Sequence, residues 1–505
     1  MSSLQGKTDR NDGVEHVVKT LRELIKDMPY FLESRGDLDT EVWDLTASSR
    51  DRTDKGLFFC FVGAHFDAHD YAPQAVENGS VALVVEHFLN LDVPQIRVSH
   101  GRRAMARMAA AFYDWPSRKL KLCGITGTKG KTTTSYMFKT ICETAGYRCG
   151  LIGTTGTLIG NRMLASHLTT PDPVELQKTL HDMVEEHVDI VGMEVSAHAI
   201  DMNRLDGMIF ECACYTNLSQ DHLDYFGDME TYFQTKKSFL ISDQVLNTVI
   251  NADEDSSARV LEELKTPHVS YGISADADVF ARDIEITEDG VSFDMLLRSM
   301  PFARVSLKMT GTFNVYNALA ASAMAMVLGI EPEMIRRGLE TIQSVPGRIE
   351  TLQTETPYKV ILDYSHSPDA LKNILQTVRE FSKGRVIALF GCGGDRDHGK
   401  RPKMGRIGGE LADYCILTSD NPRGEDPMAI LDAIEAGIRP TGKPYQVIED
   451  RREAIRAALK MAREGDIIVL AGKGHETYQE IKGVRRPFNE KMVVRELLDE
   501  MREGR

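Results

Sequence analysis

The sequence predicts an α/β protein that has three domains built on largely parallel sheets. One reason is the length of 505 residues, for which about three domains are typical. A second reason is the alternation of short apolar runs with helix-length segments, a pattern typical of parallel sheets covered by helices. Segments rich in proline, glycine and polar residues, at 114–117 and 344–347, interrupt this pattern. They divide the chain into predicted domains at 1–118, 119–345 and 346–505.

The composition excludes several classes of protein. The chain has 60 Lys and Arg against 75 Asp and Glu, a net charge of −15. An acidic chain is a poor ligand for nucleic acid, because neutralisation of phosphates dominates that affinity. The eight cysteines are scattered without a paired spacing, which indicates reduced thiols in the cytoplasm. No apolar run reaches 18 residues and the N-terminus is polar, so we expect neither a membrane span nor a signal peptide.

A glycine-rich turn after the apolar run at 122–125 has the composition of a phosphate-binding loop. Gly127 and Gly130 let backbone N–H groups curl around phosphate oxygens, and the predicted helix at 135–145 adds its positive N-terminal end. Lys131 would lie against the outer phosphates, and Thr132 would hold Mg²⁺. The strict motif is not met, because it requires glycine where the chain has isoleucine at 125. The strand–turn–helix context still favours a P-loop, mononucleotide-binding sheet.

Several segments of the predicted first domain have the pattern of a helix or of a buried strand. Residues 14–26 have helical spacing, 56–61 and 81–85 are apolar runs typical of buried strands, and 101–113 form an Ala- and Met-rich helix. The polar clusters at 48–50 and 63–67 are predicted to be turns.

The central domain carries polar motifs after its predicted strands. These motifs lie at 169–172, 194–198 and 217–222, and ligands of such sheets bind at the C-terminal ends of strands. Glu194 ends an apolar strand, where a buried charge requires compensation, and Mg²⁺ beside a nucleotide would supply it. His222 could be a second ligand. The alternative for both is a polar strand end that faces water. Further along, 277–309 shows the period of two that is typical of antiparallel strands at a sheet edge.

The third domain is predicted to be a Rossmann-like, doubly wound sheet. Strand and helix patterns alternate again, and three loops follow strands, at 391–396, 420–423 and 472–476. They therefore fall on one edge of the sheet. Arg396, Arg423 and Glu476 have charges complementary to a zwitterionic amino acid. A surface network of salt bridges is the alternative.

Together these motifs resemble the Mur ligase family over nearly the whole chain. The strongest parts are Thr-Gly-Thr-Lys-Gly-Lys-Thr-Thr at 126–133, Thr-Thr-Pro-Asp at 169–172, Glu-Val-Ser at 194–196, Asn-Leu-Ser-Gln-Asp-His-Leu-Asp at 217–224, Gly-Arg at 347–348, Asp-Tyr-Ser-His-Ser-Pro-Asp at 363–369, Asp-Asn-Pro-Arg at 420–423 and Gly-Lys-Gly-His-Glu at 472–476. The resemblance implies an ATP-dependent amide ligase of peptidoglycan precursor synthesis. Its domains would bind a UDP-sugar, ATP and an amino acid, in that order along the chain.

The resemblance also implies a set of site residues by matched position. Those expected to bind ATP are Gly127, Thr128, Lys129, Gly130, Lys131, Thr132, Thr133, Asn317, Arg348 and Asp363. Those expected to bind UDP-N-acetylmuramoyl-dipeptide are Ser49, Thr169, Thr170, Ser196 and Arg204. Those expected to bind meso-diaminopimelate are Arg396, Asp420, Asn421, Pro422, Arg423, Gly472 and Glu476. The expected Mg²⁺ ligands are Thr132, Glu194, His222 and a carbamate formed on Lys236, and the expected catalytic set is Lys131, Lys236, Glu194 and His222.

Some readings stay open at this point. Asp-Asn-Pro-Arg at 420–423 is the family's usual sign of diaminopimelate rather than L-lysine, and Arg423 suits the far carboxylate that lysine lacks. A lysine-adding form, a folylpolyglutamate synthase-like ligase and a nucleotide-dependent regulatory protein remain alternatives. For Lys236 the alternative is a solvated charge on a helix. Ser48, Leu168 and Met202 depart from the family's usual residues in the expected UDP-sugar site. We expect a monomer.

Overall fold

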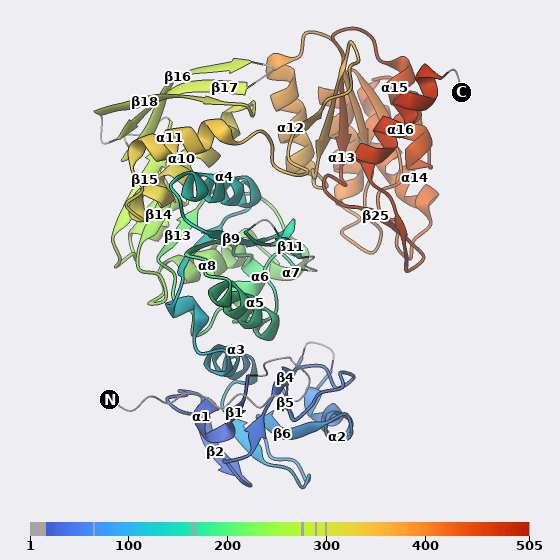
Figure 1. Ribbon diagram of the computed structural model, residues 1–505. Coiled ribbons are helices and arrows are strands. Elements are labelled where there is room, and N and C mark those ends of the chain that lie inside the picture. The colour runs from blue at the N-terminus through green and yellow to red at the C-terminus, as the bar shows by residue number, and fades with distance from the viewer. Residues whose placement is uncertain are drawn as a thin grey trace.

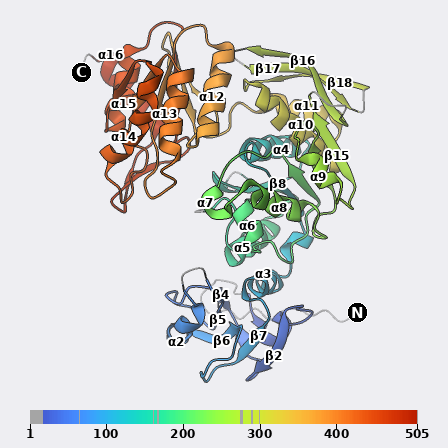
Figure 2. The ribbon, with the colours of Figure 1, turned by 180° about the vertical axis from the view of Figure 1, so that it is seen from behind.

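The computed structural model describes residues 17–63, 66–160, 162–164, 168–273, 277–287, 290–297 and 300–503. Three large sheets organise the molecule, one in each of the predicted domains (Figures 1 and 2). The N-terminal sheet lies at one end of the central sheet. The C-terminal sheet lies at the other end, beside the helices that cover one face of the central sheet. The α/β class predicted from the sequence is confirmed.

The N-terminal sheet has five strands in the order β2-β7-β6-β5-β4. Their bounds are β2 Phe31–Arg35, β4 Asp44–Thr46, β5 Gly56–Phe59, β6 Ser80–Val85 and β7 Gln95–Val98, and the helices α2 Ala72–Glu77 and α3 Gly101–Phe112 pack on the sheet. The helix predicted at 14–26 is wrong for most of its described length. Residues 14–16 lie outside the described residues, strand β1 (Lys19–Thr20) pairs with β3 (Glu41–Val42), and helix α1 spans only Leu21–Leu24. The helix begins there because Thr20 and Glu23 form a capping box.

The central sheet has eleven strands in the order β11-β10-β9-β12-β8-β13-β14-β15-β16-β17-β18. The strands from β9 to β16 in this order are parallel, and antiparallel strands flank them on both sides. The period-two segment at 277–309 forms the antiparallel strands β16 to β18, as predicted, whereas the β10–β11 hairpin was not predicted. The bounds are β8 Lys121–Thr126, β9 Cys149–Gly153, β10 Gly156–Ile159, β11 Arg162–Leu164, β12 Ile190–Glu194, β13 Cys212–Tyr215, β14 Thr248–Asn251, β15 His268–Gly272, β16 Val279–Thr287, β17 Gly290–Leu297 and β18 Met300–Leu307.

Helices cover both faces of the central sheet and form two apolar cores. Helices α4 (Lys131–Thr144), α10 (Thr312–Val327) and α11 (Pro332–Thr341) pack in the first core. Helices α5 (Pro173–Glu185) and α8 (Met229–Leu240) pack in the second. Helix α10 is apolar on nearly all sides because it lies between α4, α11 and the sheet. The short helices α6 (Ala197–Asp201), α7 (Leu223–Phe226) and α9 (Ser257–Leu261) complete this part of the chain.

The C-terminal sheet has six strands in the order β19-β20-β24-β21-β22-β23, and all pairs except β19–β20 are parallel. The doubly wound arrangement is confirmed, because α12, α13 and α14 pack on one face and α15 and α16 on the other. A small hairpin, β25–β26, lies beside the sheet. The bounds are β19 Glu350–Leu352, β20 Lys359–Asp363, α12 Pro368–Phe381, β21 Val386–Phe390, α13 Lys400–Leu411, β22 Tyr414–Leu417, α14 Pro427–Ile438, β23 Tyr445–Val447, α15 Arg451–Met461, β24 Ile467–Ala471, β25 Tyr478–Ile481, β26 Val484–Pro487 and α16 Glu490–Arg502.

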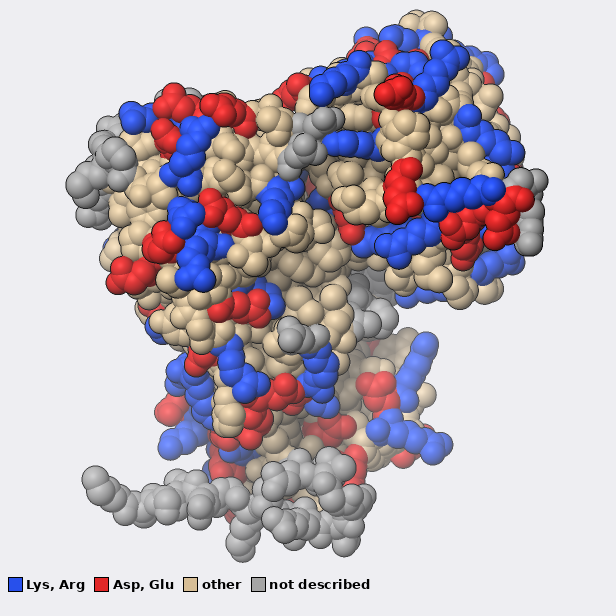
Figure 3. All heavy atoms as spheres, turned by 45° about the horizontal axis from the view of Figure 1, so that its top comes forward, with Lys and Arg blue, Asp and Glu red and all other residues tan. Residues whose placement is uncertain are grey.

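The surface matches the composition. On the face in Figure 3, Lys and Arg alternate with Asp and Glu, and that face has no extended patch of a single sign. All eight cysteines are buried and free. Within the described part of the chain, we find no helix long and apolar enough to cross a membrane.

Candidate active site

The phosphate-loop candidate lies between β8 and α4, and its glycines are required by the local backbone. Gly127 has φ +144°, and a Cβ atom there would lie 1.9 Å from the Thr216 hydroxyl oxygen. Gly130 has φ +83° and caps the N-terminus of α4. The segment after β13 supports the loop, because the Asn217 carbonyl accepts from the N–H of Thr128 and the Asn217 side chain accepts from the N–H of Lys129. Asn217, the first residue of the 217–222 motif, therefore fixes the backbone of the loop at Thr128 and Lys129.

Two lysines converge on one carbonyl oxygen of this loop. The Lys131 ammonium donates to the carbonyls of Gly127 and Thr128, both at 2.9 Å, and the Lys236 ammonium from α8 donates to Gly127 O at 3.1 Å. Lys236 is 1% exposed, so the alternative of a solvated helix charge is wrong. Burial lowers the pKa of Lys236 well below its usual value, and the charge of Lys131 lowers it further. Burial also lowers the pKa of Lys131, although Glu194 opposes the shift.

Glu194 lies at the end of β12 and is fully buried. Its carboxylate accepts from the backbone N–H and the hydroxyl of Thr154, both at 3.0 Å. Both of these donors are neutral, and the carboxylate interacts electrostatically with the nearby Lys131. The alternative of a strand end that faces water is wrong for Glu194.

His222 begins α7 and lies beside His198, with ring centroids 4.8 Å apart. The His222 side chain is 47% exposed, so it faces water in part, unlike Glu194. Partial burial lowers the pKa of His222, Asp221 opposes the shift, and the nearby charges of Lys131 and Lys236 lower the pKa further, which favours the neutral, metal-binding imidazole. The described residues contain no cluster of three His, Cys, Asp or Glu side chains able to hold a metal ion. An acidic side chain, an imidazole and a hydroxyl fit Mg²⁺, because Mg²⁺ takes few protein ligands and completes its shell with water and phosphate.

A contact from the C-terminal domain reaches the phosphate loop. The Arg348 guanidinium donates to the Thr132 hydroxyl at 3.1 Å. Asp363, at the end of β20, accepts from the N–H of Ile349 at 2.9 Å and so fixes the backbone beside Arg348. Asn317 on α10 reaches the same helix start, where its side-chain oxygen accepts from Thr134 at 3.3 Å. Three of the residues expected at the ATP site, from three segments, therefore surround or brace the loop.

Four of the five residues expected at the UDP-sugar site lie together at the end of β12. The Thr170 hydroxyl donates to the Glu194 carbonyl at 2.8 Å and accepts from the N–H of Ser196 at 3.0 Å. Arg204 donates to the Thr170 carbonyl at 2.7 Å, and Thr169 hydrogen-bonds Thr154 at 3.1 Å.

Ser49 is the exception, because it lies in the N-terminal domain and donates to Gln74 at 2.9 Å.

The departures from the family pattern have different consequences. The Met202 sulfur accepts from Arg204 at 3.4 Å and so supports that arginine. Leu168 is exposed.

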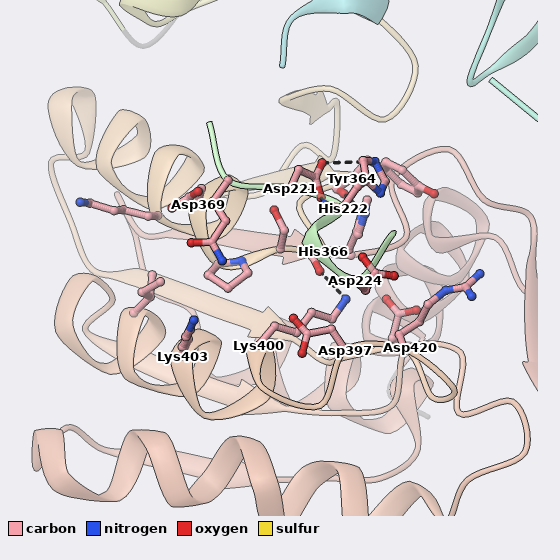
Figure 4. Close-up of a pocket in the computed structure, with 18 of the residues that line it drawn as sticks. Asp221, His222, Asp224, Tyr364, His366, Asp369, Asp397, Lys400, Lys403 and Asp420 are labelled. Atoms are coloured by element: carbon pink, nitrogen blue, oxygen red, sulfur yellow. Dashed lines mark hydrogen bonds and ion pairs between the residues drawn. The ribbon is translucent and has the colours of Figure 1, made fainter. Parts of the chain in front are cut away.

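The residues expected at the diaminopimelate site line one pocket. A cavity of about 810 Å³ lies between the segment after β13 and the C-terminal domain. In Figure 4, Asp221 and His222 of the segment after β13 lie on one side of the pocket. Asp397, Lys400 and Asp420 of the C-terminal domain lie on the other side. Of the seven expected residues, only Pro422 is not part of the lining, which includes Arg396, Asp420, Asn421, Arg423, Gly472 and Glu476.

Lys473 lies behind this pocket, outside its lining, and the sequence analysis missed it. Its side chain is fully buried and donates to Asn421 at 3.0 Å and to Glu476 at 2.9 Å. Burial raises the pKa of Asp420, but Lys473 and Arg451 outweigh it and hold that pKa below its usual value. An Asp420 oxygen is buried without a hydrogen-bond partner among the described residues. The position of Lys473 between Gly472 and Gly474, in a recognised motif, was a signal that could have identified this lysine.

The arrangement of Arg396, Arg423 and Glu476 differs from a simple surface network. Arg396 is exposed at the pocket, Arg423 donates to the Gly394 carbonyl at 2.7 Å, and Glu476 accepts from Asn421 and Lys473. None of the ion pairs found among the described residues joins the three to one another. Charges of both signs therefore face the same cavity, as a zwitterionic ligand requires.

Comparison with known proteins adds the family relationship. Residues 125–325 match the model of the Mur ligase middle domain, and residues 347–474 match the model of the Mur ligase glutamate ligase domain. The chain is 43% identical to UDP-N-acetylmuramoyl-L-alanyl-D-glutamate–2,6-diaminopimelate ligase 1 of Clostridium acetobutylicum, over 95% of this chain and 99% of that relative. The corresponding ligase of Geobacillus thermodenitrificans is also 43% identical, over 95% and 100%. A solved structure of a ligase of this name superposes with a TM-score of 0.69 and 30% identity, covering 96% of this chain and 99% of the other.

The half-buried position of Lys131 beside Lys236 generates a prediction for Lys131→Met. Because the folded-state pKa of Lys131 is below its unfolded value, its charge opposes folding at neutral pH, and this penalty disappears as pH rises toward the unfolded pKa of about 10.4. The melting temperature of the unmodified chain should therefore rise relative to that of the variant between pH 7 and 9.5. Turnover should fall on the order of a hundred- to a thousandfold, because a donor to the phosphates is lost.

Lys178→Met, on the exposed side of α5, is the control. It should show neither the pH trend nor the loss of turnover. Parallel melting profiles for Lys131→Met and the unmodified chain would show that the charge of Lys131 is not suppressed in the folded state.

Proposed function

Because the chain belongs to the Mur ligase family, we propose that it joins meso-diaminopimelate to UDP-N-acetylmuramoyl-L-alanyl-D-glutamate with hydrolysis of ATP. The proposal rests on one pocket. There, two loops of the C-terminal domain, at 420–423 and 472–476, meet the segment that follows β13. Relatives that are 43% identical over almost their whole length are ligases of this name.

The first step would form an acyl phosphate. The terminal carboxylate of the UDP-linked dipeptide attacks the γ-phosphorus of ATP, the bond to the β-phosphate oxygen breaks, and ADP leaves. Lys131 and the N–H groups at the start of α4 bind the phosphates, and Arg348 approaches the same loop from the C-terminal domain. Catalysis here consists of positioning the reactants and stabilising the charge that spreads over the phosphoryl oxygens.

The second step would form the amide. The diaminopimelate amine attacks the acyl carbon, a tetrahedral intermediate collapses, inorganic phosphate leaves and the amine loses a proton. Arg396, Arg423 and Glu476 orient the amino acid through its carboxylates and ammonium group. An arginine can bind a carboxylate through two hydrogen bonds, which favours a substrate with a carboxylate at each end.

Magnesium, when bound, would neutralise phosphate charge, and Thr132, Glu194, His222 and a carbamate on Lys236 are the residues that fit it. The lowered pKa of Lys236 favours its neutral amine. This supports a carbamate on Lys236, because the neutral amine is the form that reacts with CO₂. That reaction forms the N–C bond and releases one proton. The product is an anion, which removes the repulsion between two ammonium groups on one carbonyl oxygen.

Other functions are less well supported. A regulatory protein without catalysis has no need for Lys131 and the buried Glu194 and Lys236 together. A folylpolyglutamate synthase-like ligase does not explain the Asp-Asn-Pro-Arg loop at the pocket. A ligase that adds L-lysine would use a substrate with one carboxylate fewer than meso-diaminopimelate. A monomer in the cytoplasm, where ATP and UDP-linked precursors are available, completes the proposal.

Phosphate release with ATP, Mg²⁺ and the UDP-linked dipeptide tests the substrate. We expect release with meso-diaminopimelate and much slower release with L-lysine, because lysine leaves one carboxylate site empty. Preference for lysine would keep the ligase reaction but overturn the role given to Arg423. Release with neither amine, despite binding of the UDP-sugar, would contradict the proposal.

Lys236→Ala tests the carbamate. Turnover should fall about a thousandfold, because a charged group beside the phosphates is lost, and short carboxylates should restore part of it. Lys237→Ala is the matched control, since Lys237 is adjacent on α8 but pairs with Glu263 at 2.7 Å, and it should keep most of its turnover. Near-normal turnover of Lys236→Ala would remove the carbamate from the mechanism.

A further inference from the structure

An ion pair behind the pocket connects the two loops that carry Arg396 and Arg423. Arg401, in the first turn of α13, is almost completely buried. One nitrogen of its guanidinium donates to both carboxylate oxygens of Glu425, at 2.8 and 2.9 Å. Glu425 also accepts from the backbone N–H of Asp395. The Glu425 carboxylate therefore joins α13 to Asp395, the residue that precedes Arg396. Glu425 itself comes two residues after Arg423 in the sequence.

Backbone contacts bring the same two loops close together. The N–H of Gly394 donates to the Asn421 carbonyl at 2.9 Å, and the Arg423 guanidinium donates back to the Gly394 carbonyl at 2.7 Å. The Asp395 carboxylate accepts from the N–H of Gly424 at 3.0 Å. A Cβ atom on Gly394 would lie 1.9 Å from the Pro422 carbonyl, so the loops are as close as their backbones permit.

The close approach requires a costly backbone conformation. Asp395 has φ +54° and Arg423 has φ +51°, and neither is a glycine. Residues with a side chain rarely adopt this left-handed region, because their Cβ atom approaches the following carbonyl oxygen. Each of these residues is next to, or is, an arginine that faces the pocket. The surrounding contacts must hold the conformation. The ion pair between the buried Arg401 and the partly exposed Glu425 is a charged contact that spans both loops, in addition to the Asp395–Gly424 hydrogen bond.

We propose that Arg401 and Glu425 are a positioning pair that fixes the separation of Arg396 and Arg423 and so selects an amino acid with a carboxylate at each end. The inference rests on the proposed function and deepens it. Neither residue of the pair lines the pocket. They act through the two arginines, because a shift of one loop would separate the two carboxylate sites.

A second ion pair in the same domain, also with one buried partner, offers a contrast. Arg385 binds Asp466 with two nitrogens, and Asp466 is 4% exposed. These residues precede β21 and β24, at the N-terminal ends of two central strands, whereas the loops of the pocket follow the C-terminal ends of strands. The pair stabilises the sheet but touches neither loop. Breaking it should cost stability without changing recognition of the amino acid.

The experiment measures KM for meso-diaminopimelate, L-lysine, ATP and the UDP-linked dipeptide, with melting temperature, in Glu425→Gln. Glutamine keeps the size of the side chain and an acceptor for Asp395 but loses the charge. We expect KM for diaminopimelate to rise on the order of ten- to a hundredfold. The preference for diaminopimelate over lysine should narrow by a similar factor, while KM for ATP stays unchanged.

Two further variants separate positioning from stability. Arg401→Met combined with Glu425→Gln removes both charges, so stability lost in the single variant should return, while KM for diaminopimelate stays raised. Asp466→Asn should lower the melting temperature and leave that KM unchanged. If KM and the preference are unaltered in Glu425→Gln, or recover with stability in the double variant, the positioning role is wrong. Failure of the unmodified chain to use diaminopimelate would instead reject the proposed function.

Discussion

The interaction on which the site depends is the convergence of the Lys131 and Lys236 ammonium groups on the carbonyl oxygen of Gly127. Two ammonium groups so close together, one of them fully buried and the other half-buried, are costly unless anions lie beside them. Among the described residues, neither lysine forms an ion pair. The loop is thus arranged for anionic ligands, and phosphate groups and a carbamate both meet that requirement. Glu194 presents the opposite case, a buried carboxylate whose hydrogen-bond donors are neutral.

The surrounding elements serve to bring other groups to this charge. The parallel order of β12, β8 and β13 places the ends of three strands side by side, and each end carries a motif of the site. Arg348 then links the C-terminal domain to Thr132. In that domain, buried cations lie behind the pocket. Lys473 holds Asn421 and Glu476, and Arg451 donates to the carbonyls of Ser419 and Ala471, the residues that precede Asp420 and Gly472. Buried charge therefore shapes both halves of the site.

Much of this could be predicted from the sequence, because periodicity and motif position carry the information. The alternation that predicted both parallel sheets follows from burial on two faces, and the period of two at 277–309 follows from a one-sided edge. Helix α4 begins at Lys131 rather than at 135, because Gly130 caps it despite the three threonines that follow. The short α1 follows β1, which pairs with β3 further along the chain, and single-segment patterns do not contain such pairing. The β10–β11 hairpin pairs residues that are close in the sequence, such as Ile159 with Arg162, and the sequence analysis did not identify it.

The buried cations show the other limit of prediction. Charged residues are usually exposed, so nothing in the local sequence distinguishes Arg401 or Arg451 from a solvated side chain, whereas Lys473 at least lies within a recognised motif. The same holds for Lys236, which only its motif position identified. Burial of these side chains follows from tertiary packing, and it is this packing that gives them their chemical roles. Ser49 lies in the N-terminal domain, apart from Thr170 and Ser196, so the sequence could place it in a shared site only by resemblance.

The central claim is that the buried amine of Lys236 is converted to an anion beside the phosphate loop. Carbon-13 NMR of the protein equilibrated with ¹³C-labelled bicarbonate tests this directly, with Lys236→Met as the control. The account predicts a carbamate carbonyl resonance in the unmodified chain that is absent in the variant. No such resonance from a preparation that is fully active in phosphate release would contradict it.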